Sequence, residues 1–179
     1  MEADRDAFLW VVDHRAGWLN PVFVGLSVLG YAGLVWVVLA PALAAWARRS
    51  PLLFLAGTAA TVWAADLISF GLKQLVDRPR PFEVVRGVDT LMHASGPSFP
   101  SGHATTAFAG AVLLGSLVRR ALPALLLLAT AIAFSRVYVG VHYPLDVLAG
   151  AALGTAVALV AIALLRAPRP PSGRLRRSA

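Results

Sequence analysis

Five long apolar runs constrain the fold of this chain more than any other feature of its sequence. They cover residues 21–46, 51–72, 104–118, 121–139 and 145–165. Each is close to the roughly 20 residues that a helix needs to cross the hydrocarbon core of a membrane. The third run is short, and we expect its helix to begin near Ser101. The sequence therefore predicts an all-α, polytopic membrane helix bundle with about five transmembrane helices.

The first 18 residues do not fit a spanning helix. The stretch at 8–15, Phe-Leu-Trp-Val-Val-Asp-His-Arg, is too short and too charged to cross a membrane. Its Trp and Phe are typical of a helix that lies in the interface, so we predict an interfacial helix within residues 1–18 and six helices in total. Residues 1–166 then form a single transmembrane domain. Residues 167–179, rich in Pro, Ser and Arg, are predicted to be a disordered basic tail.

The composition excludes several classes of function. Only 14% of the residues are charged, against about 25% in a typical soluble domain. The chain has no cysteine, which excludes disulfides and thiolate metal sites. In a soluble protein, its net charge of +7 would indicate a nucleic-acid-binding function. Here the basic residues cluster at the ends of the apolar runs, so we interpret them as topology signals and predict no nucleic-acid partner.

The basic residues also predict the orientation of the bundle. With five spans, nine of the sixteen Lys and Arg residues share one side, at 48–49, 119–120, 166, 169, 174 and 176–177. Cytoplasmic loops are enriched in Lys and Arg, so this side and the tail are expected in the cytoplasm. The loops 73–100 and 139–144 are then extracytoplasmic. Seven basic residues remain on that side, at 5, 15, 73, 78, 80, 86 and 136, and topology does not explain them.

Most polar functional groups of the chain fall in three segments on that outer side, 73–81, 99–103 and 135–146. Lys73, Arg80 and Arg136 supply donors that match the oxygens of a phosphoryl group. Ser101 and Gly102 stand where a helix begins, and free N–H groups there favour an anion. Each residue alone has a simpler explanation, such as an arginine that snorkels to the headgroups or a serine that caps a helix. Their joint occurrence favours a phosphate site.

Two histidines are candidate reactive groups. His142 and Asp146 are four residues apart with Pro144 between them, which places Asp146 near the third position of a helix, within reach of the His142 ring. A carboxylate on one ring nitrogen leaves the other free as a nucleophile. The alternative is that Asp146 only compensates the helix dipole and that His142 is a solvated loop residue. His103, beside Ser101 and Gly102, is placed to protonate a leaving oxygen.

These segments resemble the signature of the type-2 phosphatidic acid phosphatase (PAP2) superfamily. Lys73, six residues, Arg80-Pro81 is similar to its first motif, Pro100-Ser101-Gly102-His103 to its second, and Ser135-Arg136, five residues, His142, three residues, Asp146 to its third. The resemblance implies that His142 attacks phosphorus and forms a phosphohistidine, that Asp146 orients it, and that His103 serves as general acid and then base. It also implies that the phosphoryl oxygens are held by Lys73, Arg80, Ser101, Gly102 and Arg136. It implies no metal and no cofactor.

Because no extramembrane domain is predicted, the expected substrate is a lipid phosphate or diphosphate that reaches the site from the bilayer. The resemblance favours a polyprenyl diphosphate such as undecaprenyl diphosphate, with phosphatidic acid or phosphatidylglycerophosphate as the alternative. A non-catalytic membrane scaffold or transporter is the alternative of another class. Two residues stay open. Arg78 repeats the Arg-Pro pattern, so a share in phosphate binding stays open for it. Asp66 is either an inner support for the polar site or, as we favour, a buried carboxyl bonded to a neighbouring helix.

Overall fold

The computed structural model describes residues 2–167, so the predicted tail, apart from Ala167, lies outside the described residues. These residues form eight α-helices: α1 Glu2–Asp13, α2 Asn20–Leu29, α3 Leu34–Trp46, α4 Pro51–Val76, α5 Pro81–Val84, α6 Gly102–Leu117, α7 Leu122–Tyr138 and α8 Pro144–Arg166. Short 3-10 turns adjoin α2, α3 and α7, at Gly17–Leu19, Tyr31–Gly33 and Arg119–Ala121. No strand occurs within residues 2–167, and the prediction of an all-α bundle is confirmed.

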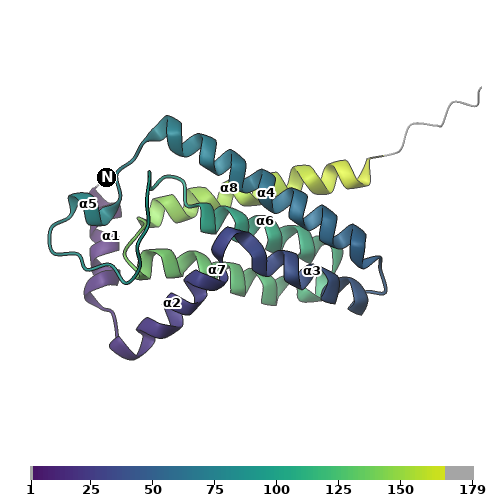
Figure 1. Ribbon diagram of the computed structural model, residues 1–179, viewed down its shortest axis with the longest axis horizontal. Helices are drawn as coiled ribbons and strands as arrows, with labels where there is room; N and C mark the ends of the chain where they lie inside the picture. Colours follow the sequence, from purple (N-terminus) through teal and green to yellow (C-terminus); the bar gives the residue numbers. More distant parts are fainter. Residues whose placement is uncertain (1, 168–179) are drawn as a thin grey trace, which may run out of the picture.

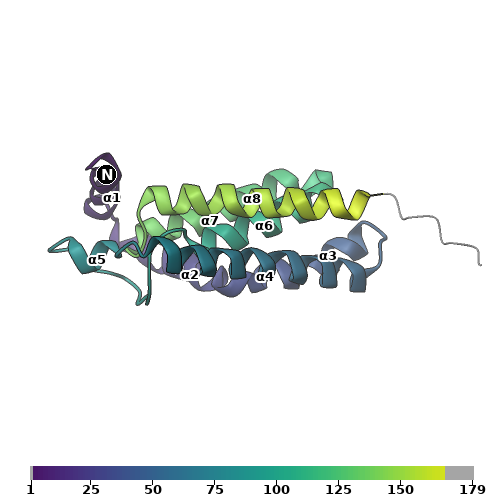
Figure 2. The same cartoon turned by 90° about the horizontal axis from the view of Figure 1, so that it is seen from above.

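The helices α3, α4, α6, α7 and α8 run along the long axis of the molecule, with α6 between the others (Figures 1 and 2). Small residues let α6 and α8 approach closely. A Cβ atom on Gly150 would lie 2.5 Å from the Ser101 carbonyl oxygen, and one on Gly154 would overlap the Thr105 carbonyl oxygen. Close packing of this kind stabilises helix pairs in membranes, where water does not drive association. It also fixes the start of α6 against the first turns of α8.

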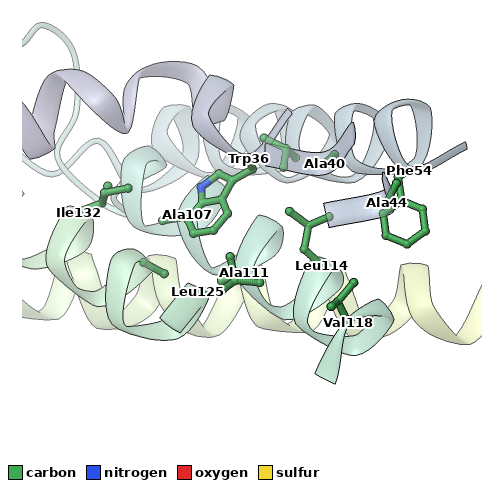
Figure 3. Close-up of a cluster of buried hydrophobic side chains, with 12 residues drawn as sticks. Trp36, Ala40, Ala44, Phe54, Ala107, Ala111, Leu114, Val118, Leu125 and Ile132 are labelled. Carbon is green, nitrogen blue, oxygen red and sulfur yellow. The ribbon is translucent and has the colours of Figure 1, made fainter. Parts of the chain in front are cut away.

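An apolar core lies between α3, α4, α6 and α7 (Figure 3). Its centre is the fully buried Trp36, whose ring lies against Gly110 at a distance that leaves no room for a Cβ atom. Ala107, Ala111 and Leu114 present the α6 side of this core. The core therefore anchors α6, the helix whose first residues belong to the second motif.

The first apolar run is not one continuous helix. The segments Gly17–Leu29 and Tyr31–Trp46 meet at an angle of 50°. The break contains two residues in the left-handed region, Ala32 with φ 49° and Gly33 with φ 67°. A Cβ atom on Gly33 would lie 3.0 Å from the Thr106 Cβ and still closer to Val62. The run predicted as one span at 21–46 is therefore a pair of helices with a bend between them, where the chain turns against α4 and α6.

By length and composition, three described helices, α4, α7 and α8, can cross a membrane, and the bent pair makes a fourth span if counted as one. The third predicted span, 104–118, corresponds to α6, which has only 16 residues, so the count of five is not confirmed. The predicted N-terminal helix is present as α1. It lies across one end of the bundle, as expected for an interfacial helix (Figures 1 and 2).

Candidate active site

The three polar segments meet at the end of the bundle where α1 and α5 lie (Figure 1). The first follows α4, the second begins α6, and the third joins α7 to α8. Together they surround a cavity of about 710 Å³. Six of the eight predicted site residues line this cavity: Lys73, Arg80, Gly102, His103, Arg136 and His142. The other two, Ser101 and Asp146, are fully buried beside it.

His142 lies in the turn between α7 and α8 with its side chain only 3% exposed, so it is not a solvated loop residue. Its Nδ1 lies 3.4 Å from Asp146 Oδ2, a long contact of the kind that tightens when substrate binds. The same oxygen accepts the Tyr143 N–H at 2.9 Å. Asp146 thus lies on the Nδ1 side of the ring, and Nε2 is the nitrogen on the side of Arg80.

The charge state of His142 suits a nucleophile. Burial lowers its pKa to about 3, and the positive charges of Arg80, Arg136 and Lys73 act in the same direction against the hydrogen bond to Asp146. At neutral pH the imidazole is therefore uncharged, with a lone pair on Nε2. The nearest cation is Arg80, whose Nη1 lies 3.4 Å from that nitrogen.

Arg80 points into the protein and does not snorkel to the headgroups. Its Nε donates to the Gly96 carbonyl at 2.7 Å, Nη1 to Val141 at 2.9 Å and Nη2 to Ser95 at 2.9 Å. Burial lowers the pKa of Arg80, and the charge of Glu83 partly offsets this effect. These carbonyl oxygens hold the guanidinium in place but carry no full negative charge, so a net positive charge remains beside His142.

The other two predicted cations are held in similar ways. Lys73 Nζ donates to the Pro97 carbonyl at 2.7 Å and to the Ser98 carbonyl at 3.2 Å. Arg136, which is 4% exposed, donates from Nη1 to the hydroxyl oxygen of Ser27 on α2. Both line the cavity. The site therefore contains three cations, the buried carboxylate of Asp146 beside His142, and the half-buried Asp66 in the cavity lining.

The second motif starts α6, with Ser101 as its N-terminal flanking residue. The Ser101 side chain does not cap the helix, and its buried Oγ has no hydrogen-bond partner within the described residues. Its N–H donates to the Asp146 carbonyl at 2.9 Å, which ties α6 to α8. A buried hydroxyl without a partner needs an explanation. A ligand oxygen at the start of α6 would supply the missing partner.

His103 and Arg136 share a supporting residue that the sequence reasoning missed. Ser27, 1% exposed on α2, presents its carbonyl oxygen 3.2 Å from His103 Nε2 and its hydroxyl to Arg136. Because a carbonyl oxygen only accepts, His103 Nε2 carries a hydrogen in this state. A single serine within an apolar run gives no pattern that identifies such a role.

The two residues left open by the sequence take different positions. Arg78 binds Asp146 Oδ1 at 2.6 Å and Asp4 Oδ2 at 2.7 Å, and it does not line the cavity, so a phosphate-binding role for Arg78 has no support. Asp66 does line the cavity, with Oδ1 3.4 Å from the position of a Cβ on Gly102. Asp66 is half-buried in the cavity, a position that fits an inner support for the polar site better than a carboxyl buried against a neighbouring helix. Within residues 2–167, no group of three or more His, Cys, Asp or Glu residues is arranged to hold a metal ion.

The family model of the PAP2 superfamily matches residues 51–169, a range that contains all three motifs. The chain belongs to the PAP2 superfamily. This PAP2 protein is 41% identical over 140 residues to the decaprenylphosphoryl-5-phosphoribose phosphatase of Mycobacterium tuberculosis, a match that covers 76% of the chain and 75% of the relative. It is 33% identical over 144 residues to the putative undecaprenyl-diphosphatase YbjG of Escherichia coli, covering 75% of the chain and 69% of the relative.

The fold of this PAP2 protein also has a solved counterpart. The crystal structure of a transmembrane PAP2-type phosphatidylglycerolphosphate phosphatase from Bacillus subtilis superimposes with a TM-score of 0.77 at 24% identity. The match covers 98% of this chain and 88% of that structure. Family and relatives together identify the protein as a PAP2-type phosphatase, a hydrolase.

Proposed function

We propose that this PAP2 protein removes the terminal phosphate of a polyprenyl-linked lipid through a phosphohistidine on His142, with undecaprenyl diphosphate as the first candidate substrate. One observation carries this proposal. The uncharged Nε2 of His142 faces a cavity whose three cations are held by carbonyl and hydroxyl oxygens and so remain available to an anion. Such preorganised charge stabilises a phosphoryl group in transfer.

The first step forms the phosphoenzyme. The Nε2 lone pair of His142 attacks phosphorus in line, and the N–P bond forms while the P–O bond to the lipid breaks. His103 enters this step as the imidazolium, a form that the negative charge of the bound phosphate favours, and gives one proton to the departing oxygen, which leaves its ring neutral. Asp146 holds the hydrogen on Nδ1 as the ring gains charge. Lys73, Arg80, Arg136, the Ser101 hydroxyl and the free N–H groups at Gly102 hold the phosphoryl oxygens.

The second step releases phosphate. A water molecule attacks phosphorus from the side that the lipid has left, and His103 now accepts its proton. The N–P bond breaks and restores neutral His142 with inorganic phosphate. The same residue serves as acid and then as base because the leaving oxygen and the incoming water occupy the same place.

Apolar side chains at the rim of the cavity support access from the bilayer. Val28 in the last turn of α2 is 59% exposed, Tyr31 in the 3-10 turn after α2 is 67% exposed, and Phe70 on α4 is 59% exposed. All three line the cavity. The helices α2 and α4 diverge toward this end of the molecule (Figure 1). We infer that an isoprenoid chain lies between them while its phosphate enters the cavity.

A second substrate candidate is a polyprenyl lipid that carries a phosphorylated sugar, as named for the relative from Mycobacterium tuberculosis. Asp66 favours this candidate, because its carboxylate is an additional acceptor in the cavity, beside Gly102 at the start of α6. A carboxylate accepts hydrogen bonds from sugar hydroxyls but repels a second phosphate. Phosphatidic acid and phosphatidylglycerophosphate remain the alternative of the glycerophospholipid class.

We also propose that the site faces the extracytoplasmic side. The opposite end of the bundle holds Arg48 and Arg49 after α3, Arg119 and Arg120 before α7, and Arg166 at the end of α8. Enrichment of arginine in connections of this kind marks the cytoplasmic side. The tail beyond residue 167 would then be cytoplasmic.

The test measures phosphate release by the purified full-length protein from four lipids, namely undecaprenyl diphosphate, decaprenylphosphoryl-5-phosphoribose, phosphatidic acid and phosphatidylglycerophosphate. We expect kcat/KM to be highest for one of the two polyprenyl lipids, and His142→Ala to abolish turnover while the bundle stays folded. Faster release from a glycerophospholipid would overturn the substrate proposal. A folded protein that releases phosphate from none of them would favour the non-catalytic scaffold or transporter.

A further inference from the structure

The N-terminal helix α1 is connected to the His142–Asp146 pair by contacts that belong to no motif. They begin at Asp4, which is only 6% exposed although it lies in a charged segment. Asp4 Oδ1 accepts the Leu145 N–H at 2.9 Å, and Asp4 Oδ2 pairs with Arg78 Nη2 at 2.7 Å. Both oxygens of the Asp4 carboxylate therefore bind residues outside α1, one in α8 and one in the segment after α4.

Arg78 continues the connection to Asp146. Its Nη1 donates to Asp146 Oδ1 at 2.6 Å, while Asp146 itself is completely buried. The guanidinium also lies over the Tyr143 ring at 4.1 Å, and that ring packs edge-on against Phe8 of α1 at 5.4 Å. Two ion pairs and an aromatic contact thus join α1, the segment after α4 and the start of α8.

These contacts fix both the backbone position of Asp146 and the rotation of its carboxylate group. The N–H groups in the first turn of a helix have no partner within the helix, and Asp4 satisfies one of them at Leu145. This fixes the first turn of α8, which carries Asp146. Arg78 holds Oδ1 and so prevents the carboxylate from rotating. Oδ2 is then kept where it meets both the Tyr143 N–H and His142 Nδ1.

We propose that Asp4 and Arg78 are positioning residues for the His142–Asp146 pair, and that α1 supports the active site as well as lying across the end of the bundle. This inference rests on the proposed function, in which His142 is the nucleophile. A role in stability alone explains the arrangement less well, because a buried ion pair adds little net stability compared with an apolar contact of the same shape. Arg78 is not placed to bind substrate, since both of its terminal nitrogens hold carboxylates and it lies outside the cavity.

The test compares four variants of the full-length protein on the best substrate. Arg78→Gln removes the bridge, Asp4→Ala removes both of its contacts, and Asp4→Asn keeps an acceptor for Leu145 but loses the charge. Arg86→Gln is the matched control, because Arg86 is an exposed arginine of the same extracytoplasmic segment. Steady-state kcat and KM are measured together with the single-turnover rate of phosphohistidine formation.

We expect Arg78→Gln and Asp4→Ala to lower kcat and the phosphorylation rate together by about 10- to 100-fold, the loss typical of a reacting group misplaced by about 1 Å. KM should change by less than about threefold, because substrate contacts are intact. Asp4→Asn should lose less than Asp4→Ala, and Arg86→Gln should match the wild type. This graded pattern keeps the test valid even if Arg78→Gln unfolds.

Two results would overturn the inference. One is a kcat within twofold of the wild type for folded Arg78→Gln and Asp4→Ala, and the other is a large rise in KM at unchanged kcat, which would make Arg78 a substrate ligand. His142→Ala separates these failures from failure of the proposed function. If that variant is inactive, only the positioning role is lost. If it remains active, the phosphohistidine mechanism itself is wrong.

Discussion

Substitution of Gly154 by alanine tests whether the contact between α6 and α8 sets the geometry of the site. A Cβ atom at this position would overlap the Thr105 carbonyl oxygen and lie 2.9 Å from the Ala109 nitrogen. Both atoms are backbone, so no side chain can move aside, and the two helices must separate. Overpacking of this kind costs about 1–3 kcal/mol. Alanine also gains about 1 kcal/mol of helix propensity over glycine, which offsets part of that cost.

Separation of α6 and α8 should also displace residues of the active site. The Ser101 N–H donates to the Asp146 carbonyl at 2.9 Å across the same helix pair. We expect Gly154→Ala to lower the melting temperature in detergent by a few degrees and kcat by about 10- to 100-fold, since displacement by about 1 Å is enough for such a loss. Gly71→Ala on α4 is the control, because nothing lies within 4 Å of its Cβ position. A Gly154→Ala protein as stable and active as Gly71→Ala would refute the reasoning.

Three further outcomes are expected. Because burial lowers the pKa of His142 to about 3, an NMR titration should show this ring neutral from pH 5 to 8, and protonation in that range would contradict the account of the nucleophile. Ser27→Ala should lower kcat by several-fold, because Arg136 loses an acceptor while the carbonyl near His103 is retained; an unchanged kcat would remove Ser27 from the site. Asp66→Asn should change the relative kcat/KM for sugar-phosphate and diphosphate lipids in favour of the diphosphate, and equal effects on both would remove Asp66 from substrate selection.

The sequence predicted the helix ends of the site well, because local signals mark them. Pro144 begins α8 as expected, which places Asp146 at the third helical position, and α6 begins at Gly102 next to the predicted Ser101. Proline at the first turn of a helix and a small polar residue just before one act within a few residues. The long apolar runs likewise predicted α4, α7 and α8, because the length and hydropathy of a segment can be read from that segment alone.

The sequence did not predict the break in the first apolar run or the supporting residues. Glycines at 30 and 33 stand in an apolar stretch that continues on both sides, so hydropathy gives no sign of a bend. Ser27 meets His103 across 76 residues, and Asp4 meets Arg78 across 74. No periodicity or local motif records a tertiary partner at such a separation. These contacts had to come from the structure.

The basic residues that topology does not explain pointed to the site, but they did not assign roles to the individual charges. The partners do. Lys73 and Arg80 are held by backbone carbonyl oxygens, which orient a cation and leave its net charge for an incoming phosphate. Arg78 is held by two carboxylates, which cancel that charge. The type of acceptor therefore separates cations that can bind substrate from a cation that positions the catalytic pair. Arg80→Gln should raise KM and lower kcat, whereas Arg78→Gln should lower kcat alone.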